Sequence, residues 1–115
     1  MKTFKKSAAQ GDCLLRRIPT RLPIGLRPIK AENGQFIIAH SETGHNHCIK
    51  ENSNVRLYET VDQFRGYLVV AGDEPVVLEH HRSFDTHEAL EINPGIYEIR
   101  RQREYTSEGF RRAAD

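Results

Sequence analysis

The 115-residue chain contains no tryptophan, one methionine and two cysteines. Cys13 and Cys48 form no CxxC pair, so we expect reduced, buried thiols rather than a disulfide framework. No apolar run approaches the ~20 residues of a membrane-spanning helix. The lysine-containing start is not followed by an uninterrupted apolar segment, unlike a secretion signal. We therefore expect a cytoplasmic protein with no membrane partner.

The chain also lacks any long segment with helical periodicity, any internal repeat and any low-complexity run. Its glycines are isolated, so no phosphate-binding loop is formed, and its serines lack a nucleophile-elbow context. No recognised nucleic-acid-binding motif occurs. These absences leave open whether the chain is an enzyme.

The sequence consists largely of short apolar stretches bounded by turn residues. Their spacing predicts an all-β protein, a small antiparallel barrel or sandwich of about eight short strands. The expected strands are 10–18, 35–40, 45–50, 55–60, 66–71, 75–80, 89–92 and 96–105.

The length fits one domain, residues 1–115, with a frayed basic lead-in at 1–9 and a loose polar tail at 106–115. The proline-rich segment between 19 and 30 should be irregular or an extended edge. The turn residues ENSN and AGDEP predict hairpins between the strands that they connect. The sequence NPG predicts a type II turn before the last strand.

Charge is unevenly distributed, although the net charge is only +1. Residues 1–30 hold eight lysines and arginines against Asp12 alone, a net +7. Residues 31–99 hold four basic and twelve acidic residues, a net −8, and residues 100–115 hold five against three, a net +2. Basic ends of this kind can contact a nucleic acid or an acidic protein.

Six histidines offer the clearest chemical signal. His45 and His47 stand one residue apart, so on a strand they share a face and can reach one ion. Glu51 shares that face if the strand continues, whereas Cys48 faces the other way. Neutral imidazoles and a carboxylate are ligands for a divalent metal ion such as Zn, Fe or Ni.

A second histidine group follows at 80, 81 and 87. If the two strands meet at one end of a barrel, His81 and His87 can supply further ligands. Only one of His80 and His81 can face inward from a regular strand. The alternation does not decide which, and we favour His81. A polar pocket without metal and inert surface histidines remain the alternatives to a metal site.

The segment HNHCIKE resembles the first motif of the cupins, in which two histidines and a nearby glutamate bind a divalent metal inside a jelly-roll barrel. The matching positions are His45, His47 and Glu51. This resemblance implies a cupin-like, metal-binding barrel, and it covers the first motif alone.

The series GDCLLRRI, TGHNH, a histidine pair six residues apart, and NPGIYEIRRQREY also resembles a family of small uncharacterised proteins of bacteria and mobile elements. That resemblance implies a shared fold and supplies no reaction.

The segment RRQREY carries the main alternative function. A strand would place Arg101, Arg103 and Tyr105 on one face, where guanidinium groups can bind phosphate and the ring can stack on a base. This pattern predicts a non-enzymatic interaction module that contacts nucleic acid or an acidic protein. Charges that protect an exposed edge strand would give the same pattern. The oligomeric state stays open, a homodimer included.

Overall fold

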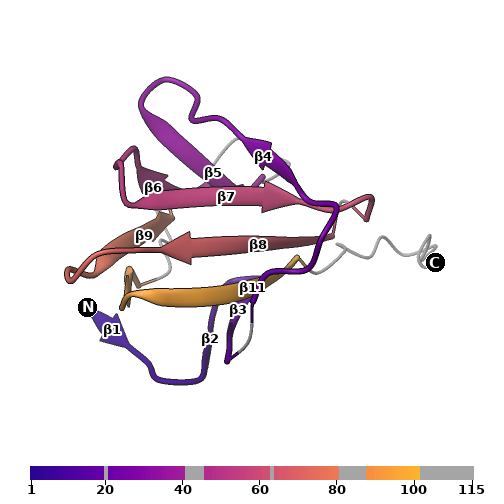
Figure 1. Ribbon diagram of the computed structural model, residues 1–115. Helices are drawn as coiled ribbons and strands as arrows, with labels where there is room; N and C mark the ends of the chain where they lie inside the picture. Colours follow the sequence, from indigo (N-terminus) through magenta and orange to yellow (C-terminus); the bar gives the residue numbers. More distant parts are fainter. Residues whose placement is uncertain (20, 41–45, 63, 81–87, 102–115) are drawn as a thin grey trace, which may run out of the picture.

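A computed structural model describes residues 1–19, 21–40, 46–62, 64–80 and 88–101. The described residues form strands and connecting turns, without a helix, arranged as two sheets (Figure 1). The prediction of an all-β fold is therefore confirmed. No helix long and apolar enough to cross a membrane occurs in these ranges.

The first sheet, sheet A, has five strands in the order β1-β10-β9-β6-β5. Their bounds are Lys2–Thr3 for β1, Leu90–Ile92 for β10, Val76–His80 for β9, His47–Lys50 for β6 and Gln35–Ala39 for β5. All neighbours are antiparallel except the short pair β1 and β10, which is parallel.

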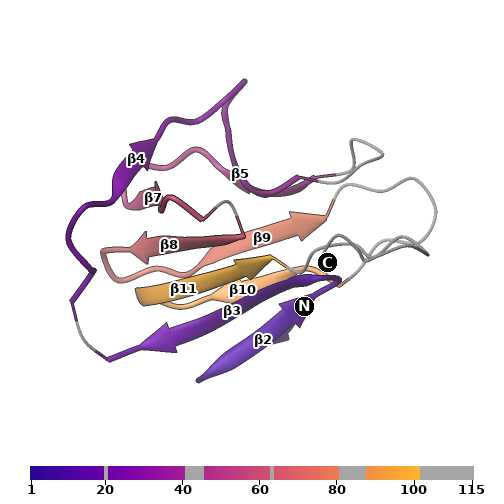
Figure 2. The same ribbon diagram turned by 90° about the vertical axis from the view of Figure 1, so that its right-hand side faces the viewer.

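The second sheet, sheet B, has six strands in the order β2-β3-β11-β8-β7-β4, all antiparallel. Their bounds are Ser7–Gln10 for β2, Cys13–Ile18 for β3, Gly95–Arg101 for β11, Arg65–Val70 for β8, Val55–Glu59 for β7 and Arg27–Ile29 for β4. The two sheets lie as layers, which the turned view makes visible (Figure 2).

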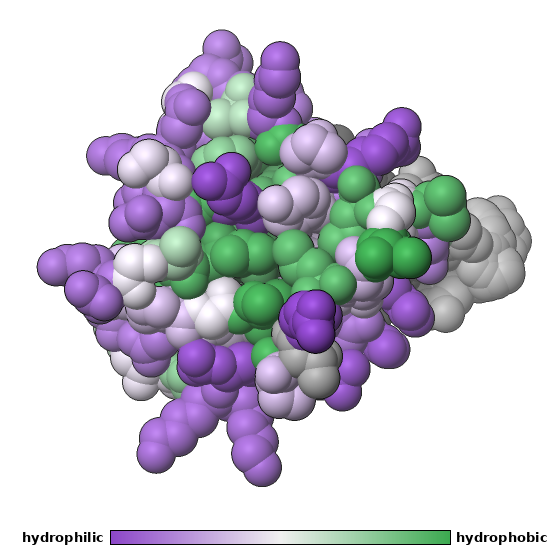
Figure 3. Space-filling model, in the orientation of Figure 1, coloured by the Kyte–Doolittle hydropathy of each residue, from purple (hydrophilic) through white to green (hydrophobic). Residues whose placement is uncertain are grey.

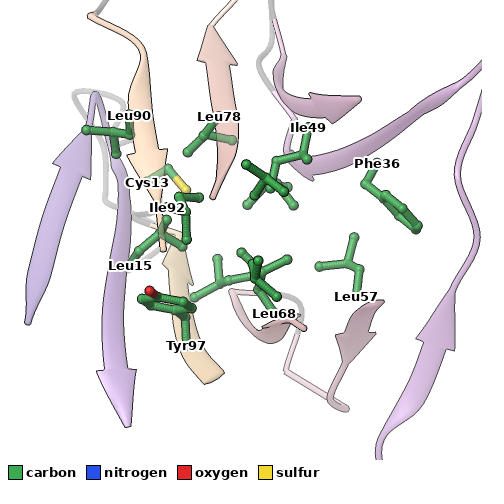
Figure 4. Close-up of a cluster of buried hydrophobic side chains, with 14 of the residues drawn as sticks. Cys13, Leu15, Phe36, Ile49, Leu57, Leu68, Leu78, Leu90, Ile92 and Tyr97 are labelled. Carbon is green, nitrogen blue, oxygen red and sulfur yellow. The ribbon is translucent and has the colours of Figure 1, made fainter. Parts of the chain in front are cut away.

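The core lies between these layers because each strand alternates an inward apolar residue with an outward one. In β8, for example, Gly66, Leu68 and Val70 are buried while Arg65, Tyr67 and Val69 are not. Leu15, Leu57, Leu68 and Tyr97 of sheet B meet Phe36, Ile49, Leu78 and Ile92 of sheet A (Figure 4). Burial of this apolar surface is the main stabilising contribution to the fold.

Two expectations about the first residues need correction. The lead-in at 1–9 is not frayed, because Lys2–Thr3 pairs with β10 and Ser7–Gln10 pairs with β3. The single strand expected at 10–18 is a hairpin, since Gly11 adopts a positive φ of 61° and turns the chain between Gln10 and Cys13. The tail at 106–115 lies outside the described residues.

Two hairpin predictions are also wrong. ENSN connects β6 of sheet A to β7 of sheet B, and AGDEP connects β8 of sheet B to β9 of sheet A. Each of these turns carries the chain from one layer to the other. The hairpins that form are β2–β3, β5–β6, β7–β8 and β9–β10. In the proline-rich segment, β4 is an edge strand, as expected.

Leu68 provides a test of the core, because its side chain is fully buried. We expect Leu68→Ala to lower the free energy of unfolding by about 2–5 kcal/mol through lost burial and a residual cavity. The matched control is Leu14→Ala, at a position 37% exposed on the outer face, which should cost much less. Urea unfolding of both variants measures the difference, and equal losses would contradict this placement of the core.

Candidate functional site

One end of the sandwich has a polar interior. Gln10, on β2 of sheet B, is only 1% exposed and reaches across to sheet A. Its Nε2 donates hydrogen bonds to the carbonyl oxygens of Leu78 at 2.9 Å and Glu88 at 3.0 Å. Its Oε1 lies 2.7 Å from Nδ1 of buried His47. This amide therefore links β2 to β6, β9 and the segment before β10.

The contacts of Gln10 favour one tautomer of the neutral His47 ring. Two carbonyl oxygens accept from the amide nitrogen of Gln10, so its oxygen is the atom that faces the imidazole. An oxygen acceptor requires a proton on Nδ1. In the neutral ring the lone pair then belongs to Nε2, which lies 3.9 Å from Oδ1 of Asp12. A hydrogen bond from Nδ1 to an oxygen is also how metal-binding histidines are commonly oriented.

His47 and His80 meet as direct cross-strand neighbours of β6 and β9. Their rings are stacked, with centroids 4.0 Å apart and planes 6° apart, and both residues are buried. The nitrogen lone pair of an imidazole lies in the plane of its ring, and the planes of two stacked rings are parallel and separate. One ion therefore cannot lie in the plane of both rings, and this pair does not chelate one metal in its present arrangement.

The predicted metal ligands are only partly described. His45, His81 and His87 lie outside the described residues, whereas His47 is buried. His80, which was not the favoured member of the pair at 80 and 81, is also buried. Glu51 is exposed beyond the opposite end of β6, where its backbone N–H donates to the carbonyl oxygen of Gly34. Within the described ranges, no three His, Cys, Asp or Glu side chains are grouped as a metal site. Glu51 thus does not fit the ligand set implied by the cupin resemblance.

The predicted basic strand has a different environment from the one expected. β11 lies between β3 and β8, so it is a central strand and needs no charges to protect an edge. Arg101 shares the inward parity of Tyr97 and Ile99, and its Nε donates to the carbonyl oxygen of Ile38 at 2.7 Å. Burial lowers the pKa of Arg101. Arg103 and Tyr105 lie outside the described residues.

The outer face of sheet B carries a basic cluster that sequence reasoning missed. Arg16, Arg65 and Arg100 come from β3, β8 and β11, and all three surround the carboxylate of Glu98. Arg16 and Arg100 lie 3.1 and 3.2 Å from Oε1, and Arg65 lies 3.9 Å from Oε2. This outer surface is here called the arginine face. With the exposed Arg56 of β7, its outward-facing strand positions hold four arginines and one glutamate.

Glu98 makes the cluster stable. Arg65 and Arg100 are direct cross-strand neighbours, an arrangement in which like charges repel. The Glu98 side chain is only 6% exposed, and burial alone would raise its pKa. Hydrogen bonds and charges from Arg16 and Arg100 outweigh that effect and lower the pKa below its ordinary value of 4.5. The carboxylate is therefore ionised at neutral pH, and it offsets repulsion among its neighbours.

Aromatic and apolar side chains adjoin the arginines on the same face. Tyr58 and Tyr67 are direct neighbours across β7 and β8, and Tyr67 is also opposite Glu98. Ile18, Ile96 and Val69 form a half-buried apolar row across β3, β11 and β8. Figure 3 shows this side of the molecule, with apolar side chains across its middle and polar ones around them. The face thus combines cationic, aromatic and apolar groups.

The sequence contained a partial signal for this face. Alternation along Ile96, Glu98 and Arg100 already indicated that these residues share one side of a strand. What the sequence could not supply was the order of strands in the sheet, which brings Arg16 and Arg65 to the same carboxylate from positions 82 and 33 residues earlier than Glu98.

The fold and these groups define a class: a two-sheet β protein with a buried histidine pair at one end and an arginine-rich outer face. The chain belongs to the family described as Domain of unknown function (DUF8820), whose model matches residues 9–102. Neither the curated proteins nor the solved structures include a significant match to the chain.

Glu98 provides a pH-dependent test. Because its pKa is lower in the folded chain than its ordinary value, the stability it contributes is present above about pH 4.5 and is lost as the pH falls through the folded pKa. We expect Glu98→Gln to lower the free energy of unfolding at pH 7 by about 1–3 kcal/mol. The deficit should shrink as the pH falls below the ordinary carboxyl pKa.

The matched control for this test is Glu74→Gln, the same change at an exposed turn residue. It should alter the unfolding free energy at pH 7 by no more than about 0.5 kcal/mol. Urea unfolding between pH 3 and pH 7, at about constant ionic strength, provides the measurement. A Glu98→Gln deficit that stays constant or grows at acid pH would contradict the proposed charge pairing.

Proposed function

We propose that this protein is a non-enzymatic module that binds single-stranded nucleic acid on its arginine face. The observation that carries the proposal is the group of three guanidinium ions around one buried carboxylate, beside two adjacent tyrosines. One carboxylate neutralises one of the three charges. The remaining positive charge favours a polyanion.

The arginines are suited to phosphate. The side chains of Arg16, Arg65 and Arg100 are 56%, 46% and 52% exposed, so their guanidinium groups are accessible to solvent. Glu98 restrains all three, which reduces the conformational entropy lost on binding. Guanidinium groups match phosphate oxygens with paired, charge-assisted hydrogen bonds.

The tyrosines and the apolar row favour unpaired bases. Aromatic side chains on an open sheet can stack on successive bases of a single strand, whereas stacked bases in a duplex are not available for this contact. The half-buried rings of Tyr58 and Tyr67 lie beside the arginine cluster. An acidic protein would match the charge but would not require adjacent aromatic rings.

The outer face of sheet A differs from the arginine face in its charge. Along sheet A, the outward positions include Glu79 and Glu91 as well as Lys50. At these outward strand positions acidic side chains outnumber basic ones, which is less favourable for a phosphate backbone than the arginine face. The contrast supports sheet B as the binding side.

Single-residue substitutions test the arginine face. We expect Arg65→Gln and Arg56→Gln each to weaken binding of a fluorescent single-stranded oligonucleotide several-fold at low salt. Each should also reduce the salt dependence of log Kd by about 0.7, the contribution of one phosphate contact on a single strand. Fluorescence anisotropy at several salt concentrations measures both quantities.

The matched control is Lys50→Gln, which removes one positive charge from the outer face of sheet A. It should leave affinity and salt slope close to those of the unmodified protein. Equal weakening by Lys50→Gln would show non-specific charge attraction, and binding that is insensitive to salt would overturn the proposal. Binding of an acidic peptide with the same dependence on Arg65 would favour a protein partner.

A second candidate function, divalent-metal binding, has one observation in its favour. The hydrogen bond from Nδ1 of His47 to the amide oxygen of Gln10 is of the kind that commonly orients metal-binding histidines. His47 is preceded by His45 in the sequence, and His81 and His87 follow its cross-strand neighbour His80. We propose Zn, Fe or Ni as the ion, with His47 as its inner ligand.

Metal content tests this second candidate. Untagged protein should contain about one metal ion per chain by mass spectrometry, and His47→Ala should lose it. His40→Ala, at an exposed histidine, should retain the metal and serves as the control. A metal-free protein whose thermal stability is unchanged by chelator and by added zinc would remove this candidate.

A further inference from the structure

A surface pocket of about 580 Å³ lies where the arginine face ends. It is formed between the turn that joins β2 to β3 and the turn that joins β7 to β8, next to the last residues of β11. The side chains that bear on its chemistry are Asp12, Asp62, Phe64, Arg65, Arg100 and Arg101.

Three of these residues are arginines. The contacts of Arg65 and Arg100 with Glu98 run through Nε, and their terminal nitrogens make no hydrogen bond to any residue within the described ranges. Arg101 is positioned by the sheet framework, since its backbone N–H donates to the carbonyl oxygen of Phe64 and its Nε donates to that of Ile38. The pocket therefore has cationic groups that can bind an anion.

The other lining groups narrow the choice of anion. Phe64 contributes a half-buried aromatic ring. Asp62 helps to shape the turn, because its Oδ1 accepts from the backbone N–H of Phe64 at 2.9 Å. Asp12 contributes a second carboxylate from the turn on the opposite side. Two carboxylates would disfavour a small bare dianion, but they can accept hydrogen bonds from the amino groups of a base.

A ligand that suits the arginines, the ring of Phe64 and the carboxylates has an anionic group, a flat ring and N–H donors. We propose that the pocket binds one nucleotide, with its phosphate on Arg65 and Arg100 and its base against Phe64. This inference rests on the proposed function, because Arg65 and Arg100 belong to both the pocket and the arginine face. The pocket lies at the end of the β-strands of sheet B, where the arginine face stops. We therefore expect it to hold the terminal nucleotide of a nucleic acid bound along that face.

Mononucleotides test the pocket without the polymer. Titration of the full chain with nucleoside 5′-monophosphates, followed by amide NMR shifts, should show saturable binding with the largest shifts around Asp12, Phe64 and Arg101. The matching nucleosides and inorganic phosphate should each bind at least about tenfold more weakly, because each lacks one of the two recognised groups. Inorganic phosphate binding as well as the nucleotide would overturn the assignment.

Substitution of Phe64 separates stacking from folding. Phe64→Leu keeps an apolar side chain in the turn and removes the aromatic ring, so it should weaken mononucleotide binding by about fivefold or more while thermal unfolding changes little. Phe64→Tyr should restore binding, whereas Lys50→Gln should leave it unchanged. Unchanged affinity in Phe64→Leu would contradict the proposed contact with the base.

Oligonucleotide ends distinguish this inference from the proposed function. Oligonucleotides with blocked and with free 5′ or 3′ termini should differ in affinity if a terminal nucleotide occupies the pocket. Equal affinity for all termini, together with undetectable mononucleotide binding, would reject the pocket and leave the arginine face intact. Mononucleotide binding without oligonucleotide binding would contradict nucleic-acid binding on the arginine face and would support nucleotide binding in the pocket.

Discussion

Burial of the apolar side chains between the two sheets determines the position of every other group in this protein. A strand alternates its side chains between two faces, so each residue that enters the core forces its neighbours outward. Leu15, Gly66 and Ile99 face inward, and Arg16, Arg65 and Arg100 consequently face outward on adjacent strands. The arginine face is thus a geometric consequence of the core rather than a separate motif.

The alternation was readable from the sequence, and the sheet order was not. Apolar periodicity predicted strands at most of the observed positions, and isolated turn residues predicted where the chain reverses. The residues of a turn determine only the local backbone conformation, however. They do not determine whether the next strand joins the same sheet or the other one. ENSN and AGDEP therefore predicted hairpins at places where the chain passes to the other layer. Gly11, within an apparent strand, was the signal for the β2–β3 hairpin.

The histidines also show which features the sequence predicts and which features need the structure. The pattern around residue 47 predicted a strand whose histidines share one face, and the structure places the imidazole of His47 in the interior beside His80. The essential partner, Gln10, carries no distinctive sequence signal, because an amide is an ordinary residue at a strand end. Only the packing of β2 against sheet A reveals that this amide holds His47 in one tautomer. A metal-ligand pattern and an internal polar link between sheets therefore look alike in sequence.

Cys13 lies opposite Arg101 on the inner side of β3, and burial raises the pKa of its thiol to about 12. Burial also raises the pKa of the Cys48 thiol, with a further contribution from Glu79. A thiol reacts through its thiolate, so the sulfur of Cys13 is almost inert to alkylation while the sandwich is closed. Modification of Cys13 is consequently limited by the opening of the fold, so this cysteine, which belongs to the core between the sheets, reports how often the layers separate.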